Sequence, residues 1–403
     1  MGSEMCIRDR YPVVYVIVAA ALRQIPSDLE LAARVSGAGS GTVLRTVTIP
    51  LLGPAFLSAF TLTAVSNLAD FGIPSILGSP VRFETLATMC YRFMESGTVS
   101  NPLQVVSTVG ALLMLLGIIA VVADYAVSSR ASSQVSGAST MKLSLGVARV
   151  PVTVVSWVLA LAITLGPILG LAHRALLPAP GVPFTLETIS LSNFQRTLSN
   201  PRVVDGFTNS VALAGGAALL SGLLGWAIGI LVTRTRARTN TPLSLATLLP
   251  AALPGLIIGV GWLIVGRYTG LYNTRWVILL AYVCAFTALV LQAVRAPMSK
   301  IPVAVEEAAR VSGAGRVRSI VDTSGRMAVP AAFSGAVLVA VTAVRELTVS
   351  ILLVAPGTTT IGVQLFNLQQ SGNYNQASAL ALMFAVIGIA ALALTVRNPD
   401  KES

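Results

Sequence analysis

Long apolar runs constrain this chain more than any other feature of its sequence. A helix that crosses the hydrocarbon core of a bilayer, about 30 Å thick, needs about 20 apolar residues. Eight runs meet this need, and a shorter ninth run at 11–22 resembles the end of a span. The runs are unbroken and lack the short alternating segments of a membrane barrel. The sequence therefore predicts an all-α membrane protein, a polytopic helical bundle with spans near 52–78, 102–123, 150–172, 207–232, 243–265, 276–294, 331–355 and 377–396.

Composition and charge agree with a chain that is largely solvated by lipid. The chain is 54% hydrophobic and 11% charged, whereas soluble domains carry about 25% charged residues. The formal net charge is +11, and it is unevenly placed: seventeen lysines and arginines fall in loops on one side of the spans and seven on the other. Loops rich in lysine and arginine stay in the cytoplasm. The basic excess therefore predicts membrane orientation, and no nucleic-acid partner is expected.

One polar phrase occurs twice between the apolar runs. Residues 32–39, AARVSGAG, return letter for letter at 308–315, and the preceding Ile-Pro pair at 25–26 returns at 301–302. Each copy is followed by a proline, a long span, a polar outer loop and a last span. Both copies lie on the predicted cytoplasmic side. A duplicated polar island of this kind is more typical of a docking surface than of packing, and it predicts two tandem units in parallel orientation.

The two predicted units are unequal in length. Four apolar runs precede the second island, but only the stub at 11–22 precedes the first. We therefore expect the first unit to be truncated at its N-terminus. The expected parts are a non-native or assembly scar at 1–10, the C-terminal part of the first unit at 11–123, a cytoplasmic linker at 124–149 and a second, complete unit at 150–398.

The spacing inside the islands carries a family resemblance. The first island has Ala32 and Ala33, then three residues before Gly37, then nine residues before a Val-Thr-Ile-Pro stretch that ends at Pro50. This pattern resembles the E-A-A-x3-G-x9-I-x-L-P cytoplasmic loop of MetI-like inner-membrane permeases in binding-protein-dependent ABC importers. Two departures stand out. Leu31 occupies the position of the motif's glutamate, and in the second island thirteen residues separate Gly313 from its closing Met-Ala-Val-Pro stretch.

The resemblance implies that each island is a short helix that docks on an ATPase subunit. Proline suits the start of such a helix, alanines permit close approach, and glycine can adopt the left-handed conformation that ends it. Acidic residues near its start interact favourably with the helix dipole and can meet basic groups on a partner. The coupling residues implied by the motif are Glu30, Ala32, Ala33, Gly37, Glu306, Glu307, Ala308, Ala309 and Gly313.

The chain carries no ATP-binding motif of its own. Its three lysines, Lys142, Lys300 and Lys401, all lie outside any G-x-x-x-x-G-K-[ST] loop. We therefore expect a transport subunit without cofactor rather than an enzyme. The resemblance implies three kinds of partner in a bacterial plasma membrane: two ATP-binding cassette ATPase subunits, a periplasmic or lipid-anchored substrate-binding protein, and membrane lipid.

Charged residues inside predicted spans are candidates for the transport pathway. Asp70, Arg345 and Glu346 stand out because intramembrane charge is costly and is usually functional. The alternative is that they pair inside the bundle or mark a helix end that reaches water. The fused double-unit layout, the phrases around these residues and the Ser-Gly outer loops resemble ferric-iron importer permeases. Thiamine, polyamine, sulfate and phosphonate remain alternative substrates.

Other function classes find little support in the sequence. Cys6, Cys90 and Cys284 are isolated, and His173 is the only histidine, so no metal site, disulfide framework or catalytic cluster is expected. A secondary transporter typically has inverted repeats, whereas the two predicted units are parallel. A membrane enzyme would need a polar catalytic cluster, which these residues do not supply.

Overall fold

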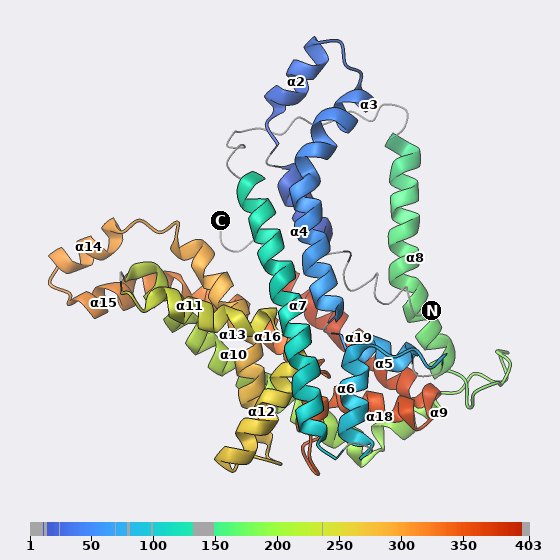
Figure 1. Ribbon diagram of the computed structural model, residues 1–403. Coiled ribbons are helices and arrows are strands. Elements are labelled where there is room, and N and C mark those ends of the chain that lie inside the picture. The colour runs from blue at the N-terminus through green and yellow to red at the C-terminus, as the bar shows by residue number, and fades with distance from the viewer. Residues whose placement is uncertain are drawn as a thin grey trace. The chain divides into compact units, whose positions relative to one another are not determined.

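The computed structural model describes residues 11, 14–23, 25–68, 70–78, 81–97, 100–131, 149–235 and 237–396 (Figure 1). Every regular element in these ranges is a helix, so the predicted all-α class is confirmed. Five of these helices are long and apolar enough to cross a membrane, and up to seven spans result if each of two bent helix pairs is counted as one. The expected scar at 1–10 lies outside the described residues.

The chain falls into two compact units. Unit 1 comprises residues 1–86 and 111–170, and unit 2 comprises residues 87–110 and 171–403. The helix α6 (Leu86–Glu95) and the first part of α7 (Pro102–Ala131) follow the first island in sequence but pack within unit 2. Tyr91 of α6 meets Phe366 of α18 (Ile361–Gln370) edge to face, with ring centroids 5.7 Å apart. Packing therefore does not follow the sequence repeat throughout.

Unit 1 contains the first island and the span that follows it. The elements are α2 (Ser27–Val35), α3 (Ser40–Val43), the π-helical turn η1 (Leu44–Thr48), α4 (Ile49–Leu68) and α5 (Gly72–Gly78). The span expected at 52–78 is not continuous, because α4 ends at Leu68 and a new helix begins at Gly72. The helix α7 continues to Ala131, so residues 124–131 of the expected linker are helical, and residues 132–148 lie outside the described residues. The next helix is α8 (Arg149–Ala175).

Unit 2 is built on three helices that pack closely against one another: α10 (Pro201–Arg234), α13 (Arg275–Met298) and α16 (Val329–Val344). Small residues allow this close approach. A Cβ atom at Gly225 of α10 would lie 2.5 Å from the Cβ atom of Val290 on α13. A Cβ atom at Gly335 of α16 would lie 2.9 Å from the Cα atom of the same Val290. Val290, fully buried, is therefore the point where the three helices converge.

Two further expected spans of unit 2 are broken. The span expected at 243–265 consists of α11 (Asn240–Leu248), a 3-10 turn η5 (Leu249–Ala252) and α12 (Gly255–Thr269). Pro254 precedes α12, and proline cannot donate the hydrogen bond that would continue a helix. The span expected at 331–355 ends at Val344 and resumes as α17 (Ser350–Leu353). The remaining elements are α9 (Ser192–Leu198), α14 (Ala304–Val311), α15 (Arg316–Ile320), the π-helical turn η6 (Val321–Gly325) and α19 (Tyr374–Val396).

Candidate functional site

The two islands fold into loops of the same conformation, which we call the first island loop (residues 25–48) and the second island loop (residues 301–324). In the first loop α2 ends before Gly37, whose φ is +88°. The Gly37 amide donates to the carbonyl of Arg34 at 2.9 Å and the Ala38 amide to that of Ala33 at 3.0 Å. These two bonds form a Schellman motif, with glycine at the left-handed position.

The second island loop repeats this geometry 276 positions later. Gly313 has a φ of +94°. Its amide donates to the carbonyl of Arg310 at 3.0 Å, and the Ala314 amide donates to that of Ala309 at 3.0 Å. The sequence repeat is therefore also a structural repeat, and the glycines serve as the expected helix-ending residues.

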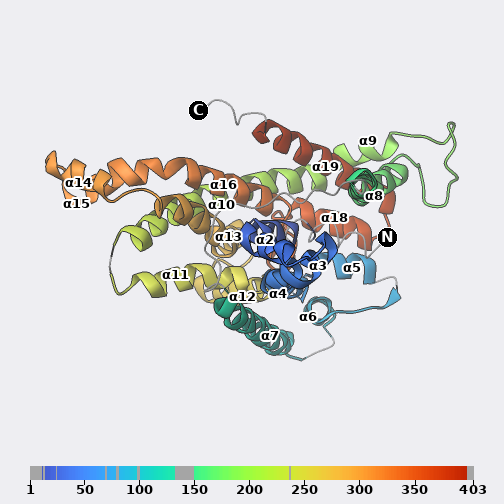
Figure 2. The ribbon, with the colours of Figure 1, turned by 90° about the horizontal axis from the view of Figure 1, so that it is seen from above.

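Both loops present one exposed helix face. Val35 on α2 and Val311 on α14 are each 89% exposed, although valine is usually buried. Ala32, Ala308 and Glu307 are exposed on the same short helices. In unit 1, α2 lies beyond the end of α4, and in unit 2, α14 and α15 lie beyond the ends of α10 and α16 (Figures 1 and 2). Each loop therefore offers an apolar contact surface at the end of a span.

The glutamates of the two loops divide into buried and exposed positions. Glu30 and Glu306 are each only 7% exposed. Thr48 donates to Glu30 Oε1 at 3.1 Å, and Ser324 donates to Glu306 Oε1 at 2.6 Å, across 18 residues in both loops. Both carboxylates face their own loop in the structure, and a coupling role for Glu30 and Glu306 stays a prediction. A two-turn helix that exposes Val311 turns Glu306 toward η6 instead.

This pairing also aligns the two islands residue by residue. The structural counterpart of Glu30 is Glu306. The counterpart of the exposed Glu307 is Leu31, which is 45% exposed. The first loop therefore presents a leucine where the second presents a carboxylate.

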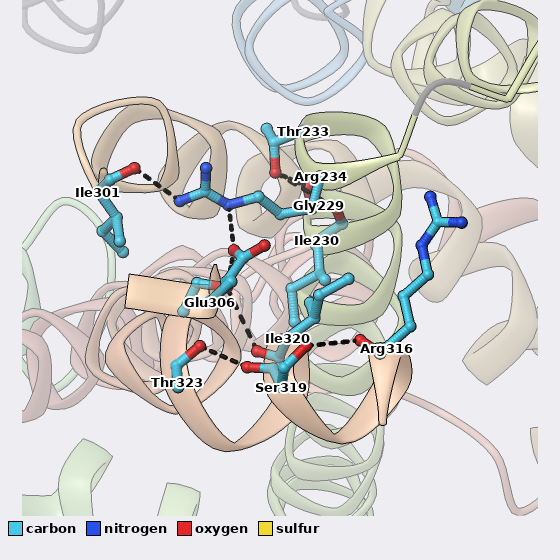
Figure 3. A network of polar contacts seen from close by, with 11 residues as sticks. Gly229, Ile230, Thr233, Arg234, Ile301, Glu306, Arg316, Ser319, Ile320 and Thr323 are labelled. Atoms are coloured by element: carbon cyan, nitrogen blue, oxygen red, sulfur yellow. Dashed lines mark hydrogen bonds and ion pairs between the residues drawn. The ribbon is translucent and has the colours of Figure 1, made fainter. Parts of the chain in front are cut away.

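Arg234 at the end of α10 contacts the second island loop from outside it (Figure 3). Its Nε lies 2.8 Å from Glu306 Oε1, and the two side chains are 7% and 9% exposed. Its Nη2 donates to the carbonyl of Ile301 at 2.8 Å. Earlier on the same helix, Trp226 Nε1 donates to the carbonyl of Gly325 at 2.9 Å. Sequence reasoning missed Arg234 because it lies 72 residues before Glu306.

The four additional residues of the second island change the junction between the loop and its span, and they leave the loop itself unchanged. The spacing from buried glutamate to hydroxyl partner is 18 residues in both copies. Residues 40–68 then form one span, whereas residues 316–325 and 329–344 are bent by 66° at the break between them. Pro330 is the second residue of α16, just after this break, as Pro50 is the second residue of α4. The second loop therefore joins its span through a bend that the first loop lacks.

The pathway candidates Asp70 and Glu346 cap short helices at equivalent breaks. Asp70 Oδ1 accepts from the amides of Gly72 and Ile73 at 3.0 and 3.4 Å, at the start of α5. Glu346 Oε1 accepts from the Val349 amide at 2.9 Å, ahead of α17. Arg345 is exposed at the end of α16. The helix-end alternative accounts for these contacts, and a pathway role for the three residues stays a prediction.

Substitution at these caps separates hydrogen bonding from charge. We expect Asp70→Ala to lower the free energy of unfolding by about 0.5–2 kcal/mol, because it leaves amide donors at the start of α5 without an acceptor. Asp70→Asn keeps an acceptor oxygen and should cost much less. Thermal unfolding of the purified chain in detergent measures both. Equal losses for the two variants would show that charge, rather than capping, matters at this position.

No group of three or more histidine, cysteine, aspartate or glutamate side chains suited to a metal ion occurs within the described ranges. Cys90 of α6 is buried, and burial raises the pKa of its thiol to about 11. A thiol with so high a pKa is largely protonated near neutral pH and is a poor metal ligand.

Comparison with known proteins gives these loops a context. Residues 11–133 and 221–397 match the family model described as binding-protein-dependent transport system inner membrane component. The ferric transport system permease protein of Actinobacillus pleuropneumoniae is 24% identical over 391 residues, which cover 94% of this chain and 55% of the relative. A probable ABC transporter permease protein of Sinorhizobium fredii is 26% identical over 333 residues, covering 76% and 56%. The chain spans about half the length of these curated relatives.

Two other similarities concern different substrates. A putative 2-aminoethylphosphonate transport system permease protein of Salmonella typhimurium is 24% identical over 185 residues, covering 45% of this chain and 70% of the relative. A crystal structure of a bacterial ABC transporter involved in the import of the acidic polysaccharide alginate superimposes with a TM-score of 0.53 at 17% identity. That match covers 64% of this chain and all of the other chain, and it supports the fold.

The match to the family model is extensive enough to assign the chain to a family. It extends over most of the sequence in two segments, and each segment contains one island loop. The apolar helices of the structure suit the family's location in the inner membrane. The chain is a multi-pass inner-membrane protein that belongs to the family of binding-protein-dependent transport system inner membrane components.

Proposed function

We propose that this chain is the permease subunit of an ABC importer, which forms the translocation path through the membrane and couples it to a separate ATPase. One observation carries this proposal: the same helix–Schellman loop occurs twice, each time with an exposed valine, at the end of a span. A docking surface explains why a polar loop is duplicated together with its exposed apolar side chain.

The proposal includes two ATPase subunits, one on each island loop, and a substrate-binding protein on the outer side. ATP is bound and hydrolysed by the partner, because the chain has no phosphate-binding lysine loop. Within the chain, the coupling surface consists of the exposed residues of α2 and α14. Gly37 and Gly313 shape that surface, and Glu30 and Glu306 hold it in place from inside.

Ferric iron is the proposed substrate. Support comes from the ferric transport permease of Actinobacillus pleuropneumoniae, whose match extends over nearly the whole of this chain. Phosphonate is the second candidate, supported by the Salmonella relative, whose match covers less than half of this chain. Asp70, Arg345 and Glu346 are the residues we propose for the pathway, since they lie at the two equivalent helix breaks.

Uptake into proteoliposomes that contain the complete transporter tests both the importer role and the proposed substrate. Radiolabelled ferric iron on its binding protein should accumulate when ATP is supplied on the cytoplasmic side and should not accumulate with a non-hydrolysable ATP analogue. Parallel assays use 2-aminoethylphosphonate and thiamine, each with its own binding protein. Accumulation of phosphonate instead of iron would overturn the substrate assignment. Accumulation that is independent of ATP would overturn the importer role itself and favour a secondary transporter.

A further inference from the structure

Arg234 connects the second island loop to α10, a helix that is not adjacent to the loop in sequence. Its guanidinium contacts the carbonyl of Ile301, where the loop begins, and the carboxylate of Glu306 on α14. Glu306 in turn accepts from Ser324 in η6, the turn that leads to α16. The Nε–H of Arg234 is not aligned for a hydrogen bond to Glu306, so this contact is an ion pair. Figure 3 shows the guanidinium between Ile301 and Glu306.

The burial of this pair distinguishes it from the other ion pair of the loop. The side chains of Arg234 and Glu306 are 7% and 9% exposed, whereas those of Arg318 and Asp322, an i,i+4 pair on α15 and η6, are 80% and 61% exposed. Exposed pairs contribute little, because water and salt screen them. A buried pair is not an efficient way to gain stability, since apolar residues often replace it without loss, but removal of one partner leaves an uncompensated charge. Loss of either Arg234 or Glu306 would therefore leave the other as a buried charge without its partner.

The first island loop supplies the comparison. Glu30 is buried to the same extent as Glu306 and has the same hydroxyl contact, from Thr48. Its other oxygen, Oε2, is buried without a hydrogen-bond partner in the described part of the chain. Among the described residues, the Glu306 carboxylate therefore has a cation from α10, and the Glu30 carboxylate has the hydroxyl contact alone.

We propose that Arg234 is a positioning residue that fastens the second island loop to the cytoplasmic end of α10. A displacement of α14 by a docked subunit is then delivered to α10 through Arg234 and to α16 through Ser324. The helix α10 packs against both α13 and α16, so a pull on its end reaches the core of unit 2. The helices on either side of the break before α16 are bent by 66°. A bent joint transmits a push less directly than a straight helix, so the attachment to α10 through Arg234 gives the displacement a second route into unit 2. The proposal rests on the permease function proposed above.

The test compares Arg234→Met with Arg234→Lys in the complete transporter in nanodiscs, with Arg295→Met as control. Arg295 also lies near the end of a unit 2 helix, but it is exposed and its side chain donates to Ser244. Two quantities are measured: hydrogen–deuterium exchange of residues 304–313, and ferric iron moved per ATP hydrolysed. We expect Arg234→Met to speed exchange at least about tenfold, because the loop loses its attachment to α10. Iron moved per ATP should fall to a similar degree while ATPase subunits stay bound.

The control variants decide between a positioning role and a general loss of structure. Arg234→Lys should restore part of the coupling ratio, and Arg295→Met should change neither quantity. If Arg234→Met does not accumulate, Glu306→Gln replaces it, since glutamine keeps the contact with Ser324 and removes the charge. An unchanged ratio of iron moved to ATP hydrolysed, in a variant whose loop exchange has risen, would overturn the proposal. A wild-type complex that moves no substrate contradicts the proposed function instead, and loop exchange then still decides whether Arg234 holds the loop.

Discussion

Gly225→Leu should abolish the accumulation of folded chain in the membrane. A Cβ atom at this position would lie 2.5 Å from Val290 Cβ and 2.7 Å from Val290 Cγ1. A leucine must therefore push α10 away from α13, and Val290 cannot yield because it also contacts α16 at Gly335. Overpacking a core typically costs about 1–3 kcal/mol. Here a larger loss is expected, since helix association in lipid depends on close packing.

Gly215→Leu is the matched control for this substitution. Gly215 lies on the same helix, is exposed, and a Cβ atom there would have nothing within 4 Å. Glycine is about 0.8–1 kcal/mol less favourable than alanine in a helix interior, and leucine ranks just below alanine, so the substitution also favours the helix. Fluorescence-detected size-exclusion chromatography of the two variants should give a normal peak for Gly215→Leu and none for Gly225→Leu. Normal peaks for both would show that α10 and α13 do not pack as the structure describes.

Gly313→Val should abolish ATP-driven uptake without preventing membrane insertion. The φ of +94° at Gly313 lies in a region that side chains with a Cβ atom rarely adopt. A left-handed conformation costs a non-glycine residue about 1–2 kcal/mol, and a β-branched residue suits it poorly. The helix α14 has only eight residues and cannot hold its shape alone. The end that carries Val311 should therefore unwind, and the coupling surface should be lost.

Gly313→Asn separates this conformational effect from the loss of a small side chain. Asparagine tolerates the left-handed region and is found at helix ends in this role. A Cβ atom at Gly313 would have no other atom within 4 Å, so a larger side chain finds space there. Uptake in proteoliposomes should be largely retained by Gly313→Asn and lost in Gly313→Val. Similar uptake in the two variants would rule out the left-handed turn as the reason for glycine.

Local signals explain what the sequence predicted well. The spans follow from the length of apolar runs, and the island helices follow from a proline before them and a glycine after them. The breaks in three spans were missed because hydropathy averages over them. Asp70, Pro254 and Glu346 mark the breaks, and each is a residue that caps or interrupts a helix. Read as helix-end signals, these three residues would have located all three breaks.

The orientation of the island glutamates depended on contacts that no local pattern shows. Glu306 looked like a partner-facing acid because it opens a short helix. Its burial results from Arg234, which comes from another helix, and from Ser324 beyond the turn. One usable signal was present: a hydroxyl residue follows the glutamate by 18 residues in both copies. The repeated spacing pairs Glu30 with Glu306, as the structure does.

The mass of the intact complex tests the central claim most directly, because two island loops should bind two ATPase subunits. Val35 and Val311 are each 89% exposed, so Val35→Asp and Val311→Asp should remove an apolar contact without disturbing the fold. Leu186, 91% exposed in a predicted outer loop, supplies the control Leu186→Asp. Native mass spectrometry should find two ATPase subunits on the wild-type chain and on the control, one on each single variant and none on the double variant. Two subunits on the double variant would contradict the account.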